Sequence, residues 1–255
     1  METYVRDLIS RYIEAYPATT GAEPIWGRPL IGVAAAADPI FPTLKTRISP
    51  THALPGDILA DARSVIVYFI PFVREVPLSN VGGRETSRTW ATAYIATNKL
   101  ILAINTHVRD RLAERGHTAV VLPATHNFDR QKLISDWSHR HIAYIAGLGT
   151  FGLNNMLITA RGCCGRLGSI VTDLELAPTP RPAGENCLYT AGGGCGKCVD
   201  RCVNGALTRE GFDRHRCEAM CRENADRLAE LGLADVCGKC LVSLPCSFTN
   251  PRQNS

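Results

Sequence analysis

The chain has 255 residues, of which 45% are hydrophobic, and it carries a formal net charge of +4. A chain of this size can bury the core of one large domain and one small one, and its modest charge neither requires nor excludes a nucleic-acid partner. The N-terminus has early acidic residues and no apolar core of a signal peptide, and the longest apolar stretch, residues 64–73, is too short to span a membrane. We expect a cytoplasmic protein without a membrane partner.

The first two-thirds of the chain alternates between helix and strand patterns. Residues 1–16 place apolar side chains on one helical stripe, and residues 87–115 do the same over a longer helix that Gly116 would end. A buried strand is predicted for residues 62–73, a strand or a buried turn for residues 29–37, a further strand for residues 117–122, and a second helix for residues 131–146. This alternation predicts an α/β layer structure for residues 1–177, and an α+β class for the whole chain.

A proline-rich stretch separates this region from the rest. Prolines occupy every second position at Pro178, Pro180 and Pro182, a pattern that neither a helix nor a central strand tolerates. We therefore predict a linker here, followed by a second domain over residues 185–255.

Nine of the eleven cysteines lie in this second domain. They form the runs Cys187-x7-Cys195-x2-Cys198-x3-Cys202 and Cys237-x2-Cys240-x5-Cys246, with Cys217 and Cys221 between them. In a reducing compartment such spacing favours metal over disulfides. Zinc would leave one surplus cysteine in each run, whereas two-cluster ferredoxins use that cysteine as a ligand of the other cluster. Two 4Fe-4S clusters are the leading hypothesis, and a zinc-stabilised binding module is kept as an alternative.

The crossover pattern divides eight cysteines into two sets of ligands. The first set is Cys187, Cys195, Cys198 and Cys246, and the second is Cys202, Cys217, Cys237 and Cys240. Cys221 lies one helical turn from Cys217 and is its rival, but the start of a helix favours a thiolate at Cys217. The side chains of the adjacent Cys163 and Cys164 diverge, so a shared metal is not expected; both are predicted to be core or loop residues, with a cofactor-lining role as the alternative.

Two motifs resemble the epoxyqueuosine reductase family. Residues 146–158 carry Gly-Leu-Gly-x-x-Gly-x-Asn and residues 167–176 carry Thr-Asp-Leu, followed by two cysteine runs in the family's order. The resemblance implies a nitroreductase-like α/β domain that binds cobalamin, and a two-cluster ferredoxin-like module that reduces it, as in reductive dehalogenases. On the family's cofactor stretch fall Gly147, Gly149, Gly152 and Asn154.

The chain also departs from this family. Leu153 stands where the family has lysine, and neither Leu122 nor Leu133, the two positions that match its general-acid aspartate, is acidic. His126 and Asp129, with Asp136 nearby, are the candidates to supply a proton. The paired His139 and His141 point to different faces of a helix and are not expected to chelate one metal.

Two functions from different classes follow. The first is a corrinoid-dependent reductase that takes electrons from an external ferredoxin or flavodoxin type of donor and acts on a small molecule. The second is an auxiliary electron carrier that reduces a corrinoid-protein partner without substrate chemistry of its own. Because the family's tRNA-holding helical repeats are not found before Ser255, we expect no nucleic-acid partner.

Overall fold

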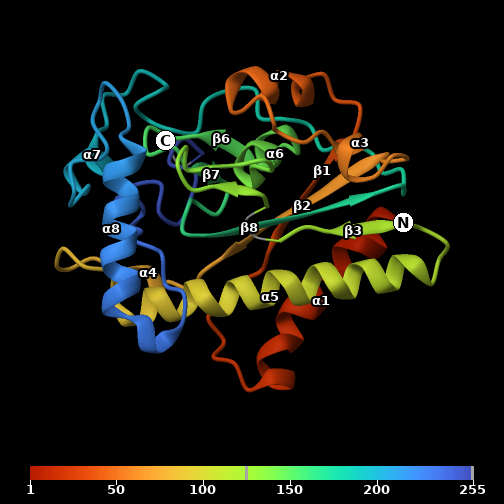
Figure 1. Cartoon of the computed structure of the whole chain (residues 1–255), viewed down its shortest axis with the longest axis horizontal. Helices are drawn as coiled ribbons and strands as arrows, with labels where there is room; N and C mark the ends of the chain where they lie inside the picture. Colours follow the sequence, from red (N-terminus) through yellow and green to blue (C-terminus); the bar gives the residue numbers. More distant parts are fainter. Residues whose placement is uncertain (124–125, 254–255) are drawn as a thin grey trace.

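The computed structural model describes residues 1–123 and 126–253 of the chain, and its centre is a four-stranded antiparallel sheet (Figure 1). The strand order is β1 (Leu30–Ala35), β2 (Ser64–Pro71), β8 (Gly165–Thr172) and β3 (Ala119–Val121). All eight residues of β2 are buried, because β2 lies inside the sheet and helices or loops cover both of its faces. The predicted buried strand at residues 62–73 is confirmed.

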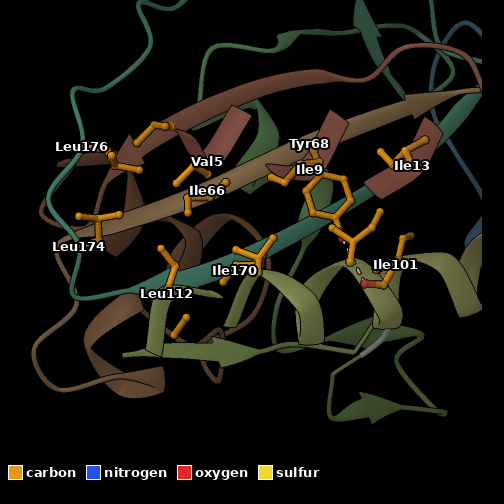
Figure 2. Packing of buried hydrophobic residues seen from close by; sticks show 14 of the residues in the cluster. Val5, Ile9, Ile13, Ile66, Tyr68, Ile101, Leu112, Ile170, Leu174 and Leu176 are labelled. Carbon is orange, nitrogen blue, oxygen red and sulfur yellow. Dashed lines mark hydrogen bonds between the residues drawn. The ribbon is translucent and has the colours of Figure 1, made fainter. Parts of the chain in front are cut away.

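Two helices cover one face of the sheet. Helix α1 (Glu2–Thr20) and the long helix α5 (Arg88–Ala113) pack on the same side of it, and Figure 2 shows Val5 and Ile9 of α1 against Ile66 and Tyr68 of β2. Alternate residues of β2 point to this side, as the two-residue period of a strand requires. Apolar burial on this face therefore fixes the orientation of β2 and β8.

The opposite face carries shorter elements. They are α2 (Ile40–Arg47), α3 (Pro55–Ile58) and α6 (His139–Ile145), with the hairpins β4 (Phe128–Asp129)–β5 (Ile134–Ser135) and β6 (Gly149–Phe151)–β7 (Leu157–Thr159). Residues Val65, Val67 and Phe69 of β2 pack into this second core. Among the described residues, no helix is both long and apolar enough to cross a membrane.

The cysteine-rich region gathers beyond one end of the sheet (Figure 1). It contains α7 (Lys197–Asp200), α8 (Arg214–Arg227) and the 3₁₀ helices η1 (Ala229–Leu231) and η2 (Lys239–Leu241), and α4 (Glu75–Ser79) lies near it. One buried cluster joins this region to the sheet, because Phe72 and Trp90 pack with Cys187, Leu241 and Val242.

The helix predicted at residues 131–146 is wrong over its first half. The Asp129 carboxylate accepts hydrogen bonds from the N–H groups of Gln131 and Lys132, and Leu133 has a φ of 52°, so the chain turns back into β5. Only His139–Ile145 is helical. A side chain that offers the backbone other hydrogen bonds competes with a helix in this way. The long helix predicted at residues 87–115 is confirmed as α5.

Candidate metal and cofactor site

The four cysteines of the first predicted set line one cavity. Cys187, Cys195, Cys198 and Cys246 all line this cavity, although 59 positions separate the first from the last. Cys195 precedes α7 and Cys198 lies in it, which places two thiols on one tight turn. Four thiols around one cavity match the donor chemistry that an iron–sulfur cluster needs.

Cys246 is held in this cavity by a short two-stranded contact. The N–H of Cys163 donates to the carbonyl of Cys246 at 2.9 Å, and the N–H of Cys164 donates to that of Ser247 at 3.1 Å. The buried Ser247 hydroxyl donates to the Leu241 carbonyl at 2.7 Å. These bonds join the turn before β8 to the end of the cysteine region.

The thiols of the second predicted set also lie close to one another. Burial raises the pKa of the Cys240 thiol, and the neighbouring thiols of Cys237, Cys217 and Cys202, together with Cys198 of the first set, raise it further. Cys237 and Cys240 flank the start of η2, where Gly238 turns the chain with a φ of 72°. The four predicted ligands therefore share one region, as a second cluster would require.

Cys221 lies beside Cys217 on α8. The two thiols are in hydrogen-bonding contact, which lowers the pKa of Cys217 and raises that of Cys221. The choice between them as a ligand stays open. Over the ranges 1–123 and 126–253, no three His, Cys, Asp or Glu side chains are close enough together to hold a single metal ion.

A much larger cavity lies next to the thiol cavity. It has a volume of about 730 Å³ between β8, α6, the two hairpins and the start of α8, which lies within the range of about 300–1,000 Å³ for a small-molecule pocket. Four arginines line it, namely Arg47, Arg140, Arg166 and Arg214, and no carboxylate does so among the described lining residues. Its positive charge suits a ligand that carries phosphate or another anion.

Two histidines on α6 also line this cavity. Burial lowers the pKa of both His139 and His141 to about 4, so both rings are neutral at neutral pH. His139 contacts the Pro123 carbonyl through Nε2 and the Ser169 hydroxyl through Nδ1, each at 3.0 Å. Since a carbonyl only accepts, Nε2 carries the proton and Nδ1 accepts from Ser169. The other histidine, His141, contacts the Ser138 hydroxyl through its Nδ1 at 2.7 Å.

The two predicted proton donors lie away from the lining of this cavity. Asp129 caps the β4–β5 turn, and the N–H groups of Lys132 and Gln131 lower the pKa of its carboxylate. His126 binds Ser135 through its backbone, with its N–H donating at 3.2 Å. Neither residue is among those that line the large cavity. Their catalytic roles stay predictions.

The glycine-rich stretch is packed mainly against the chain itself. A Cβ at Gly147 would lie 2.6 Å from the Pro180 carbonyl oxygen, and one at Gly149 would lie 2.1 Å from that of Ile158. Gly152 and Asn154 border the thiol cavity, and the Asn154 side chain donates to the Cys240 carbonyl at 3.0 Å. This stretch therefore positions the β6–β7 hairpin against the cysteine region, and its cofactor role stays a prediction.

Sequence reasoning missed the placement of the four arginines. Cys163 is buried, as expected of a core residue, and it also lines the large cavity, which agrees with the cofactor-lining alternative. The arginines come from four separate elements, so no local spacing marks them as a group.

No family model matches the chain. It is 28% identical over 199 residues to the epoxyqueuosine reductase of Bacillus cereus. The matched region covers 74% of this chain and 46% of that protein. The chain thus spans less than half the length of this relative. Solved structures of epoxyqueuosine reductases also match its fold.

Two of those structures illustrate the likeness. The Bacillus subtilis enzyme has a TM-score of 0.57 at 17% identity, covering 95% of this chain and 66% of that one. A second, with an epoxyqueuosine-modified tRNA-Tyr stem loop, has the same TM-score and coverage at 18% identity. The mixed α/β fold is thereby confirmed. That neighbour contains a tRNA stem loop, whereas we expected no nucleic-acid partner for this chain.

Proposed function

This chain is related to the epoxyqueuosine reductases, and from that premise we propose that it is an oxidoreductase in which two 4Fe-4S clusters pass electrons to a bound corrinoid. The observation that carries the proposal is the convergence of Cys187, Cys195, Cys198 and Cys246 on one cavity beside a much larger one. Thiols from both ends of the cysteine region meet there, which is the crossover that a two-cluster module requires.

The finer architecture belongs to the same proposal. Residues 1–177 would be a nitroreductase-like α/β domain that binds the corrinoid and the substrate, and residues 185–255 a two-cluster ferredoxin-like domain. The second cluster would be held by Cys202, Cys217, Cys237 and Cys240. The thiols of this set raise the pKa of one another, which supports the grouping.

The large cavity would hold the corrinoid. When bound, a corrinoid supplies a cobalt centre that accepts electrons and reacts with the substrate. The arginines would neutralise anionic groups of the ligand, while the β6–β7 hairpin, through Gly152 and Asn154, separates this cavity from the thiol cavity. Gly147 and Gly149 would contribute by fixing the shape of that hairpin.

The substrate and partners are also proposals. The arginine-lined cavity offers positive charge to a phosphate-bearing substrate, and a tRNA stem loop is one such candidate because a structural neighbour contains one. The reducing electrons would come from an external donor of the ferredoxin or flavodoxin type.

An auxiliary role is the second candidate. The described lining of the large cavity contains no carboxylate, and its two histidines are neutral at physiological pH, so a ready proton donor has not been identified there. An electron carrier that reduces a corrinoid-protein partner needs no such donor.

Anaerobic purification with metal and cofactor analysis tests the proposal. We expect about eight irons per chain, little zinc, and retention of added cobalamin through desalting. Stoichiometric zinc without iron would support the binding-module alternative, and iron without corrinoid retention would leave the electron-carrier role. Activity on an epoxyqueuosine-containing tRNA stem loop then separates an enzyme from a carrier.

Ligand variants test the division of the cysteines. Cys246→Ser should remove the signal of the cluster that Cys195 and Cys198 hold, with about half of the iron, and should preserve the other cluster. Cys237→Ser is the matched variant for the second cluster. Loss of the same cluster in both variants would overturn the division.

A further inference from the structure

A chain of hydrogen bonds runs from the buried His52 ring through Ser138 to His141 on the wall of the large cavity. His52 contacts the Ala53 carbonyl through Nδ1 at 2.8 Å and the backbone N–H of Ser138 through Nε2 at 3.2 Å. A carbonyl only accepts and a backbone N–H only donates, so the His52 ring is neutral and carries its proton on Nδ1. The buried ring thereby fixes the position of Ser138 at the start of α6.

Ser138 does not use its hydroxyl to cap this helix. A serine at the N-cap ordinarily accepts a hydrogen bond from the backbone N–H two or three residues later, which here belongs to Arg140 or His141. Ser138 makes no such side-chain bond. Its hydroxyl lies instead 2.7 Å from the Nδ1 of the His141 ring. The contact therefore orients one ring at the expense of a helix cap.

The direction of this hydrogen bond sets the tautomer of His141. Because the Ser138 hydroxyl has no other acceptor among the described residues, it donates to Nδ1, and the neutral ring carries its proton on Nε2. Within the described chain, Nε2 has no hydrogen-bond partner and is not a buried atom, and the ring lines the large cavity. His141 thus presents an N–H donor to the contents of that cavity.

We propose that His141 binds a phosphate oxygen of the ligand in the large cavity through its Nε2–H, and that Ser138 is the positioning residue that keeps the proton on Nε2. The inference rests on the proposed function in that it takes the large cavity as the ligand site. It assigns a directional donor to that site, in addition to the positive charge of the arginines.

The surroundings of His141 favour an anionic oxygen. Four arginines line the same cavity, and no carboxylate does so among its described lining residues. The neighbouring Arg140 donates from Nη1 to the Asn155 carbonyl at 2.6 Å, whereas its Nε and Nη2 bind no oxygen of the described residues. A phosphate can accept from this guanidinium and from the His141 N–H through different oxygens, and hydrogen bonds to ionised acceptors are about twice as strong as neutral ones.

Packing also holds the His141 ring in place and supplies a control. The Phe151 ring of β6 lies 4.7 Å from the His141 ring, centroid to centroid, so His141→Phe keeps an aromatic contact while it removes the donor. Tyr144, on the same helix, has its ring 6.1 Å from that of Phe151 but does not line the large cavity. Tyr144→Phe therefore removes a hydroxyl beside the same ring without changing the proposed site.

Nitrogen NMR of the histidine rings tests the tautomer and the contact together. The sample is the anaerobic full-length protein with isotope-labelled histidine at neutral pH, and the His141 signal is the one that disappears in His141→Phe. We expect the proton on Nε2, and a shift of the Nε2 signal on addition of inorganic phosphate but not of sodium chloride at the same ionic strength. His139 is an internal control, because both of its ring nitrogens already have partners.

The variants separate binding from positioning. His141→Phe should weaken phosphate binding about tenfold, as expected for the loss of one hydrogen bond to a charged group. Ser138→Ala should move part of the proton to Nδ1 and weaken phosphate binding less than His141→Phe does, and Ser138→Thr, which keeps a hydroxyl, should restore both. Tyr144→Phe should bind phosphate as the wild type does.

Three outcomes would overturn the inference: a wild-type His141 with its proton on Nδ1, an Nε2 signal that phosphate leaves unchanged, or His141→Phe protein that binds phosphate as tightly as the wild type. None of them touches the proposed function, which iron content and cobalamin retention decide. Conversely, protein that lacks iron but shows the phosphate response would overturn the proposed function and support the phosphate contact of His141.

Discussion

His139 shows how burial governs a titratable group on the wall of the large cavity. Its ring lies between Ser169 of β8 and the Pro123 carbonyl, and the Trp137 indole N–H donates to the same Ser169 hydroxyl at 2.9 Å. If the His139 ring were protonated, its second N–H would face the Ser169 hydroxyl, which can turn to accept it. The buried surroundings, however, solvate the positive charge poorly. Desolvation outweighs the carbonyl contact, and the pKa falls to about 4.

This lowered pKa predicts a loss of stability in acid. An unfolded histidine has a pKa of about 6.5, so between pH 6.5 and 4 the unfolded chain binds more protons than the folded chain, and stability falls as the pH falls. We expect His139 to contribute a loss of about 2 kcal/mol from pH 7 to pH 5. Thermal unfolding followed by circular dichroism at both values measures it.

The variant His139→Gln should flatten part of this pH dependence, because the neutral side chain does not titrate. The pKa values of His141, His52 and His107 are also lowered by burial, so these residues keep the remainder. A His139→Gln slope equal to that of wild type would contradict the assignment.

At the scale of elements, the turn between β7 and β8 determines where Cys246 lies. Gly162 has a φ of 73°, and a Cβ there would lie 2.4 Å from the carbonyl oxygen of Ser247. Backbone therefore approaches backbone at the point where Cys163 and Cys164 pair with the residues around Cys246.

A Gly162→Ala substitution should disturb both stability and the first cluster. Positive φ alone costs an alanine about 1–2 kcal/mol, and displacing Ser247 adds to this cost. Gly116→Ala is the control, because Gly116 has a φ of 77° but open space around its Cβ position. We expect iron loss in Gly162→Ala only, measured by metal analysis; equal iron in both variants would contradict the role of this turn.

The elements also show what could be predicted from the sequence. The helix at α5 and the strand at β2 followed from long periodic or apolar patterns, which local sequence determines. The second helix failed because one Asp129 carboxylate redirected the backbone. The grouping of Cys187 with Cys246 came from spacing, whereas Cys163 and the cavity arginines meet only through tertiary contacts that no local pattern records.

At the scale of the whole molecule, the cysteine region and the sheet share a core. Trp90 of α5 packs with Cys187 and Leu241, and the buried Lys239 ammonium donates to the carbonyls of Asn80 and Gly82. The proline-rich stretch is also partly docked, because Thr179 exchanges two hydrogen bonds with Val33 of β1. The linker predicted from the prolines thus lies against the sheet over its first half.

Cutting the chain in the exposed part of this stretch tests how strongly the two regions depend on each other. A protease site inserted between Ala183 and Gly184 should be cleaved readily, because both residues are exposed and neither donates a backbone hydrogen bond that the fold requires. We expect both fragments to elute as one particle in gel filtration and to keep their iron, since the shared buried cluster and the Lys239 contacts do not involve the cut. Wild-type protein treated with the same protease is the control. Separation of the fragments without iron loss would show that the cysteine region folds alone. In that case the linker, and not the common core, would hold the thiol cavity next to the large cavity.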